Sequence, residues 1–165
     1  PMVERYRASA VVLHDLQTDL PVRSPTRTLR LLRDFRALVD DVRPDLIHSH
    51  FVGTTLTARL ALGRDHPVPR LFQVAGPLHM EHAVFRAVDL RSAGDADYWL
   101  GTCKWTTAAY RRAGVPADRV FDGYAGLDVE PFTNRPPGRL RAILGVGRER
   151  RLVGMVAMFY PPKRY

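Results

Sequence analysis

The fold of this chain is decided by the stretch Arg43-Pro44-Asp45-Leu46-Ile47-His48-Ser49-His50, which continues into Phe51-Val52-Gly53-Thr54-Thr55. Pro44 ends any preceding helix, because proline lacks an N–H and disfavours the helical conformation of the residue before it. The apolar pair after it predicts a short strand, on which His48 and His50 point to the same face. A helical pattern begins directly afterwards. We therefore predict a strand that feeds a helix N-terminus, which is where an α/β sheet usually binds its ligand.

Segments typical of strands and helices alternate on both sides of this stretch. Ser24 and Pro25 resemble a helix start, with a side-chain cap followed by a first-turn proline. Apolar periodicity predicts helices over 25–42, 54–62, 80–88 and 105–112, and a short one near 139–144. Short apolar runs predict strands over 8–13, 70–75, 97–102, 120–121 and 152–158. The alternation predicts an α/β fold, with a parallel sheet and helices on both faces.

Length and composition place the chain among ordinary globular proteins. Its 165 residues suit one domain, or one domain and part of another, and its hydrophobic content of 45% argues against disorder. No apolar run approaches the roughly 20 residues of a membrane span, and the polar N-terminus lacks the apolar core of a signal peptide. The single cysteine, Cys103, cannot form an internal disulfide. This favours a reducing, cytoplasmic location, and we interpret Cys103 as a packing residue rather than a nucleophile.

The net charge of +8 favours anionic partners, such as nucleic acid, acidic lipid headgroups or phosphorylated small molecules. The basic residues are scattered through the chain, without the basic blocks and interleaved aromatics typical of RNA-binding proteins. We therefore expect no specific nucleic-acid partner. A non-catalytic domain that binds anions or nucleic acid stays open as an alternative.

Four residues with side chains that can bind a metal suggest a second alternative, a metal-dependent hydrolase: His48, His50, His79 and Glu81. Such a site needs several ligands, usually with a carboxylate, and an open position for water. No second ligand group has a spacing that strengthens this hypothesis, so we predict no metal site. The other interpretation of the first pair is that one histidine lies in the core and the other lines a pocket.

Two further loops carry candidate contacts. Gly76 follows a predicted strand directly, where a glycine lets a ligand approach the backbone, and His79 lies in the same loop. By itself His79 suits a ligand contact or a structural cap equally well. Gly126 and Asp128 indicate a tight turn. A dinucleotide fingerprint is excluded, because Gly145-Val146-Gly147 has no third glycine and no preceding strand.

Taken in order, these segments resemble the retaining glycosyltransferases of family 4, whose GT-B fold consists of two Rossmann-like domains. Residues 43–50 resemble the family's RPDxxHxH strand. Residues 97–100 with Thr102 resemble its strand of aspartate, hydrophobics and a small hydroxyl residue, and residues 110–115 resemble the helix end that follows. Gly126-Leu127-Asp128 with Phe132 resembles its GxD…F turn, and residues 152–157 resemble the first strand of its second domain.

The resemblance implies transfer of a sugar, of the hexosyl type, from a nucleoside diphosphate sugar to an acceptor, without a further cofactor. It implies that His79 is catalytic and that a set of residues around it binds the substrates: His50, Gly53, Thr54, Gly76, Glu81, Thr102, Gly126 and Asp128. The partners implied are the donor, the acceptor and, because of the basic charge, the anionic inner face of a membrane at which a cytoplasmic enzyme associates peripherally.

The resemblance also predicts the domain organisation. Residues 1–133 would form the Rossmann-like acceptor-binding domain, 134–150 a linker, and 151–165 the beginning of the nucleotide-sugar-binding domain. The family's N-terminal glycine-rich loop is missing from residues 8–13, and the phosphate-clamping Arg and Lys of its second domain are not matched. We therefore expect this chain to be inactive by itself.

Overall fold

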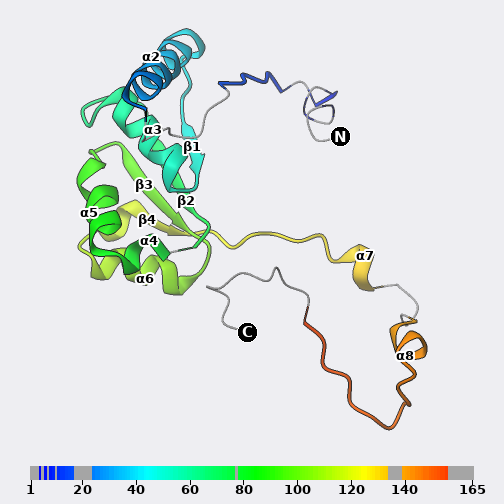
Figure 1. Ribbon diagram of the computed structural model, residues 1–165. Coiled ribbons are helices and arrows are strands. Elements are labelled where there is room, and N and C mark those ends of the chain that lie inside the picture. The colour runs from blue at the N-terminus through cyan, green and yellow to red at the C-terminus, as the bar shows by residue number, and fades with distance from the viewer. Residues whose placement is uncertain are drawn as a thin grey trace. The chain divides into compact units, whose positions relative to one another are not determined.

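The structure, a computed structural model, describes residues 4, 6, 8–9, 11–16, 24–76, 78–133 and 139–155. The chain divides into two compact units, Pro1–Ala125 and Gly126–Tyr165. The described part of unit 1 holds a four-stranded parallel sheet with the order β1-β2-β3-β4 (Figure 1). Its strands are β1 (Ile47–His50), β2 (Arg70–Val74), β3 (Asp97–Gly101) and β4 (Val120–Asp122). The predicted α/β fold with a Rossmann-like parallel sheet is confirmed.

Helices precede and connect these strands. They are α2 (Pro25–Val42), α3 (Val52–Leu62), α4 (Leu78–Glu81), α5 (Ala83–Ser92), α6 (Lys104–Arg112) and the 3-10 helix η1 (Ala117–Arg119). The predicted helix over 80–88 is wrong as a single element, because the chain leaves helical geometry at His82, where φ is −96° and ψ is 118°. This break separates the short α4 from the longer α5.

The two ends of α2 show how local sequence sets its limits. Pro25 occupies the first turn, as predicted, but the Ser24 side chain makes no capping hydrogen bond to the backbone, so that part of the prediction is wrong. At the other end Arg43 adopts the left-handed conformation, with φ of 49°, and its N–H donates to the Val39 carbonyl at 2.8 Å. Pro44 then prevents continuation, as the sequence indicated.

One face of the sheet carries the hydrophobic core. The parallel register aligns Ser49, Phe72, Trp99 and Val120 across the four strands. The last three are almost fully buried, together with Met80, Val74, Ala93, Tyr110 and Val115 from neighbouring segments. Burying each large apolar side chain of this kind contributes roughly 1.5–3 kcal/mol. This layer fixes the strand register, because a slip by one residue would turn the core side chains to the opposite face.

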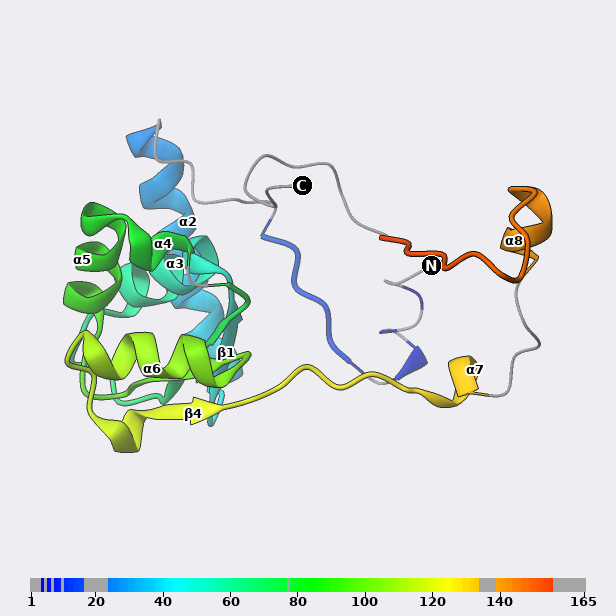
Figure 2. The same cartoon turned by 90° about the horizontal axis from the view of Figure 1, so that it is seen from below.

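The described helices of unit 1 are associated with this same face. Helix α3 packs on β1, α6 packs on β3 and β4, and α2 packs on α3; Figure 2 shows α4, α5 and α6 gathered on one side of the strands. The reason is topological: when parallel strands follow one another in sequence order, right-handed crossovers place every connecting helix on one face. On the other face lie His48, Tyr98, Leu100 and Phe121, and no described helix of unit 1 forms the second layer that we predicted there.

Two predicted strands are wrong within the described residues. In the segment 8–13, Ala8 is helical, Ser9 lies in a turn and residues 11–13 have no regular structure. Residues 152–155 of the segment 152–158 are likewise irregular and exposed, and its last three residues lie outside the described part. An apolar run becomes a strand only when a neighbouring strand accepts its backbone hydrogen bonds, and neither run pairs with a described strand.

Unit 2 has short helices at α7 (Glu130–Thr133) and α8 (Leu140–Ile143), and the latter confirms the helix predicted near 139–144. The guanidinium of Arg141 donates to the carbonyls of Gly147 and Arg150, each at 2.9 Å, and so closes the turn after α8. The linker over 134–150 and the second domain over 151–165 stay predictions. Among the described residues, no helix combines the length and apolar character needed to cross a membrane.

A glycine substitution tests the close packing at the amino ends of the strands. An alanine methyl group at Gly94 would overlap the backbone carbonyl of Arg64, whereas one at Gly53 would meet nothing within 4 Å. We expect Gly94→Ala to lower the free energy of unfolding by about 1–3 kcal/mol, because a backbone segment must move. Gly53→Ala, the matched control, should be neutral or slightly stabilising because alanine favours the helix. Chemical denaturation of both variants measures this, and equal stabilities would contradict it.

Candidate functional site

The candidate site lies at the carboxyl edge of the sheet. Because β1, β2 and β3 are parallel, the residues that follow them meet at one edge, where open α/β sheets bind ligands. His50 ends β1, Gly76 comes just after β2, and Thr102 directly follows β3. Gly53 and Thr54 lie in the first turn of α3 at the same edge. The structure therefore places these five predicted substrate-binding residues at or just beyond the carboxyl ends of three neighbouring strands.

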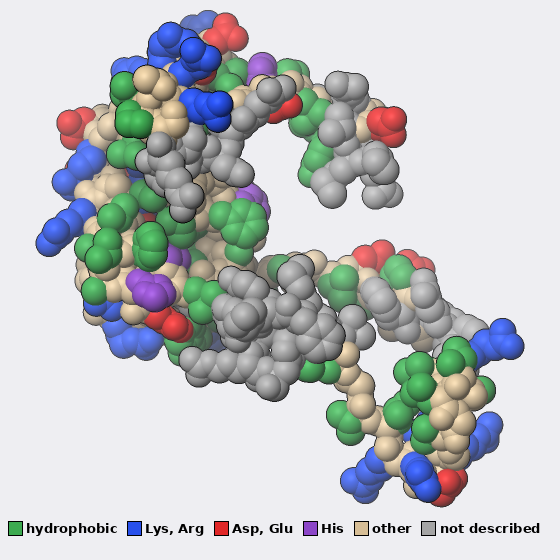
Figure 3. Space-filling model, viewed as in Figure 1, with side chains coloured by type: hydrophobic (Ala, Val, Ile, Leu, Met, Phe, Trp, Pro, Cys, Tyr) green, Lys and Arg blue, Asp and Glu red, His purple; other side chains and the backbone are tan. Residues whose placement is uncertain are grey.

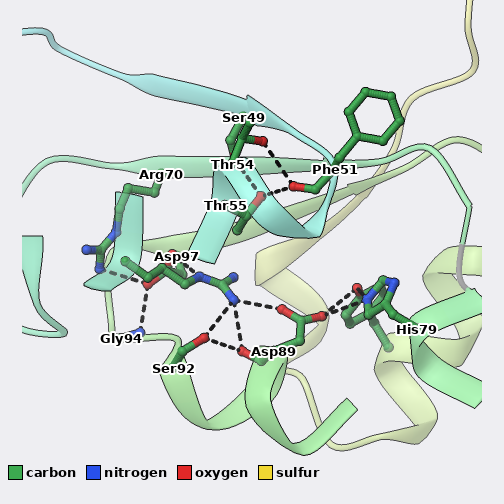
Figure 4. A network of polar contacts seen from close by, with 12 residues as sticks. Ser49, Phe51, Thr54, Thr55, Arg70, His79, Asp89, Ser92, Gly94 and Asp97 are labelled. Carbon is green, nitrogen blue, oxygen red and sulfur yellow. Dashed lines mark hydrogen bonds and ion pairs between the residues drawn. The ribbon is translucent and has the colours of Figure 1, made fainter. Parts of the chain in front are cut away.

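The junction between β1 and α3 is held in an unusual backbone conformation. Phe51, at the position before α3, has φ of 65° and ψ of 156°, a region that only glycine adopts readily, while 66% of the residue is exposed. Such a conformation costs about 1–3 kcal/mol and persists where surrounding contacts hold it. The Phe51 carbonyl accepts hydrogen bonds from the hydroxyls of Thr54 at 3.1 Å and Thr55 at 2.9 Å, and Thr55 also contacts the Ser49 hydroxyl at 2.8 Å (Figure 4).

The first turn of α3 keeps its backbone N–H groups free of side-chain caps in the described structure. Its N-cap side chain makes no hydrogen bond, and no acidic residue lies in the first turn. The hydroxyls of Thr54, Thr55 and Thr57 donate to carbonyls one turn earlier and so do not cap the N–H groups. Together with the helix dipole, uncapped N–H groups favour an anion at this position.

His48 and His50 form a pair on the uncovered face of β1. Their rings are 4.7 Å apart, which confirms that both point to the same side. Both residues are exposed, so the interpretation that one of them belongs to the core is wrong. Within the described residues, no three His, Cys, Asp or Glu side chains are grouped so that they could hold a metal ion. The structure thus gives no support to the hydrolase that we considered from His48, His50, His79 and Glu81.

His79, the predicted catalytic residue, is held by two buried side chains. Its Nε2 lies 3.1 Å from Asp89 Oδ2 and 2.8 Å from the Tyr110 hydroxyl, and that hydroxyl donates to the same carboxylate oxygen at 2.7 Å. Tyr110 is fully buried and Asp89 is 1% exposed, whereas 9% of the His79 side chain remains accessible. The two rings of His79 and Phe72 also pack 5.9 Å apart.

Asp89 belongs to a larger group of buried charges beneath the helices (Figure 4). Arg59 donates through Nη1 to Asp89 Oδ1 at 2.7 Å and through Nε to Asp97 Oδ1 at 2.9 Å. Arg70 donates to Asp97 Oδ2 at 2.8 Å, and the Arg59 guanidinium lies 5.2 Å from the centre of the Trp99 ring. All four charged side chains are at most 3% exposed, and their charges balance. We call Arg59, Arg70, Asp89 and Asp97 the buried charge quartet.

The surroundings of Asp89 and Tyr110 set the protonation states of these two side chains. Burial by itself raises the pKa of Asp89, but the hydrogen bond from His79, the Arg59 charge and the Tyr110 hydrogen bond outweigh burial, so the pKa lies below its ordinary 3.8. For Tyr110, burial raises the pKa first, and the adjacent Asp89 charge raises it further. Asp89 is therefore a carboxylate and Tyr110 a neutral phenol at neutral pH.

The remaining predicted residues lie elsewhere. Glu81 ends α4 and lines an open groove of roughly 550 Å3 between α5 and α6, together with Met80, Arg86, Leu90, Trp105, Ala109, Arg112 and Ala113. Gly126 and Asp128 belong to unit 2, where an Asp128 carboxylate oxygen accepts the Glu130 N–H at 3.1 Å and thereby closes a local turn. Cys103 occupies the N-cap position of α6 and contacts the Thr106 hydroxyl, which lowers the pKa of its thiol.

Sequence reasoning missed Phe51, Asp89 and Tyr110. Nothing in the sequence marks Phe51, because its strained conformation arises from the β1–α3 junction. A signal for the buried charges did exist: Arg70 and Asp97 have the same strand phase as the core residues Phe72 and Trp99. A charged side chain that points from a strand into the core requires an oppositely charged partner. The positions of Arg70 and Asp97 therefore indicate a group of buried ion pairs.

Comparison with known proteins gives one match. The family model described as "Glycosyl transferase 4-like domain" matches residues 2–121. Neither the curated proteins nor the solved structures include a match to this chain. Figure 3 shows basic side chains spread over α2 and other parts of unit 1, with apolar side chains between them.

The lowered pKa of Asp89 predicts how stability depends on pH. A carboxyl group with a depressed folded-state pKa stabilises the fold above the unfolded-state value, near 3.8, and this stabilisation is lost as the pH falls through the lower folded value. Tyr110→Phe removes one hydrogen bond to the carboxylate, which should cost about 1.5–3 kcal/mol at neutral pH. We expect this deficit to shrink as the pH falls below 3.8 and through the lower folded-state pKa of Asp89, because the carboxylate then becomes protonated.

Chemical denaturation across that pH range measures the deficit. Tyr124→Phe is the matched control, because Tyr124 is 64% exposed and distant in sequence from the quartet. Its stability should differ little from that of the unaltered chain. A Tyr110→Phe deficit that stays constant over the whole range would contradict the prediction.

The strained backbone at Phe51 predicts the relative stability of two variants at this position. Phe51→Gly and Phe51→Ala both remove the exposed ring, but only glycine adopts φ of 65° and ψ of 156° without steric cost. We expect the glycine variant to be more stable than the alanine variant by about 1 kcal/mol, after allowance for the greater freedom of glycine in the unfolded chain. Thermal unfolding of the pair is the measurement, and a more stable alanine variant would show that Phe51 is not strained.

Proposed function

Because the chain belongs to the glycosyl transferase 4-like family over residues 2–121, we propose that it binds the substrates of a retaining glycosyl transfer at the carboxyl edge of its sheet. The donor is a nucleoside diphosphate sugar of the hexosyl type, and unit 1 contributes mainly the acceptor side. The observation that carries this proposal is that His50, the uncapped first turn of α3 and His79 all lie at or after the carboxyl ends of the neighbouring parallel strands β1 and β2.

The α3 terminus supports a role toward anionic groups. The space around Gly53 is open enough to take a methyl group without contact, and the first-turn N–H groups of α3 have no side-chain caps in the described structure. When a nucleoside diphosphate leaves a sugar, negative charge develops on the phosphate oxygens, and fixed N–H dipoles stabilise that charge. The net charge of +8 raises the local concentration of such anions.

The exposed side chains at the same edge support acceptor binding. His50 offers ring nitrogens for hydrogen bonds to hydroxyl groups, and the exposed ring of Phe51 offers a flat apolar surface for a sugar ring. The strain at Phe51 belongs to the class of backbone distortions that gather at functional sites. We assign His50 and Phe51 to the acceptor, and His79 to a hydroxyl of the transferred sugar.

The finer assignments follow from the resemblance. Phosphate-clamping cations of the donor side would come from a second domain, so the 165-residue chain by itself should bind ligands without turnover. Gly76, Glu81, Thr102, Gly126 and Asp128 are proposed as further substrate contacts. The basic charge supports a peripheral association with an anionic membrane, and the lone cysteine supports a cytoplasmic location.

A matched pair of variants tests the role of α3. Gly53→Pro removes one first-turn N–H while keeping a residue that a first turn tolerates, and Gly53→Ala keeps the N–H. We expect the proline variant to bind nucleoside diphosphates about tenfold more weakly, which is the loss that one hydrogen bond to a charged group gives, and the alanine variant to bind normally.

The measurement is NMR titration of the 165-residue chain with UDP, GDP and ADP, and with their hexose conjugates. Thermal unfolding checks that both variants remain folded. Ligand-induced shifts at the amides of Gly53 and Thr54 in the unaltered chain would support the proposal. It would be refuted if no member of the panel shifted these amides, or if the proline and alanine variants bound equally well.

A further inference from the structure

The contacts of His79 define which of its ring nitrogens carries the proton. Only two described groups lie within hydrogen-bonding distance of Nε2: the Asp89 carboxylate and the Tyr110 hydroxyl. Asp89 is ionised and can only accept hydrogen bonds. The single hydroxyl proton of Tyr110 is donated to Asp89 Oδ2 at 2.7 Å, so the phenol oxygen can only accept from His79. Both neighbours of Nε2 are therefore acceptors, and Nε2 must be the donor.

We propose that Asp89 and Tyr110 are positioning residues, which hold the proton of His79 on Nε2 and leave Nδ1 as a hydrogen-bond acceptor for a sugar hydroxyl at the carboxyl edge. This inference rests on the proposed function, because it assigns His79 to that site. Figure 4 shows the second ring nitrogen of His79 pointing away from Asp89.

Asp89 is itself held in place by Arg59. Asp89 Oδ1 receives Arg59 Nη1 at 2.7 Å, and the Asp89 carbonyl receives the same nitrogen at 2.8 Å, so only Oδ2 faces His79 and Tyr110. Arg59 is in turn anchored on Asp97 at 2.9 Å. Because α4, which carries His79, spans only Leu78–Glu81, the buried contacts rather than the helix determine how the ring lies. A flipped ring would remove the His79 donor from Asp89 Oδ2 and leave that oxygen with the Tyr110 hydroxyl alone.

The tautomer has a chemical consequence. A bare Nδ1 accepts a hydrogen bond from an O–H group but cannot donate one, so it selects a ligand that offers a hydroxyl proton. Sugar hydroxyls meet this requirement, whereas phosphate oxygens and carbonyl groups do not. The ligand class proposed for this nitrogen is a carbohydrate hydroxyl.

The test is the state of the His79 ring, measured by long-range proton–nitrogen NMR on the unaltered 165-residue chain at neutral pH. We expect a protonated-type shift for Nε2 and an unprotonated-type shift for Nδ1. In Asp89→Asn, the side-chain amide can donate to Nε2, and the fraction of the Nδ1–H tautomer should rise about tenfold, the factor that loss of one such hydrogen bond gives. Tyr124→Phe is the control and should leave the ring shifts unchanged.

Asp89→Asn removes a charge partner of Arg59 and can fail to fold, so Tyr110→Phe supplies a second variant. It takes away one acceptor of the Nε2 proton, and we expect that proton to exchange with water about tenfold faster. An Nδ1–H or doubly protonated ring in the unaltered chain overturns the inference, as does unchanged exchange in Tyr110→Phe.

The experiment distinguishes a failure of this inference from a failure of the proposed function. Addition of the nucleoside diphosphate hexose found to bind should move the Nδ1 shift toward its hydrogen-bonded value. An Nε2–H ring that does not respond to any of these sugars supports the positioning by Asp89 and Tyr110 but contradicts the assignment of His79 to the transferred sugar. A wrong tautomer overturns the positioning even when the sugars bind.

Discussion

Arg59 joins two buried carboxylates, and most of unit 1 depends on that contact. One guanidinium from α3 reaches Asp89 on α5 and Asp97 at the start of β3, while Arg70 at the start of β2 completes the balance of charge. Removing any one partner would leave a charge in the core without compensation, at a cost of about 3–5 kcal/mol. The quartet therefore ties two helices and two strands to one arrangement.

The same contact links the core to the candidate site. Asp97 and Arg70 lie at the amino ends of their strands, whereas Asp89 reaches His79 just beyond the carboxyl end of β2. The charges thus extend beneath the helices from one edge of the sheet to the other. Since Arg59 occupies one oxygen of Asp89, the other is directed at His79 and Tyr110. A group that stabilises the fold also orients a side chain at the edge where a ligand would bind.

Backbone strain and uncapped N–H groups both occur at the β1–α3 junction, which is part of the candidate site. The backbone at Phe51 is held in a glycine-like conformation by the Thr54 and Thr55 hydroxyls, and the first turn of α3 lacks side-chain caps in the described residues. Neither feature improves stability. Both are understandable if the β1–α3 junction serves to present N–H groups and an exposed ring to a ligand, which is how strained and unsatisfied backbone is commonly used.

The sequence by itself determined the class of fold, because the alternation of strands and helices and the break at Pro44 are local properties that short-range sterics enforce. It also brought His50, Gly53 and His79 to one edge, since parallel strands end together. Only the tertiary structure decided which apolar runs became strands, because residues 11–13 and 152–155 pair with no described strand. It also decided that His79 contacts Asp89 and Tyr110. Asp89 is 10 positions and Tyr110 is 31 positions further along the chain, and they reach His79 only when α5 and α6 pack over the sheet.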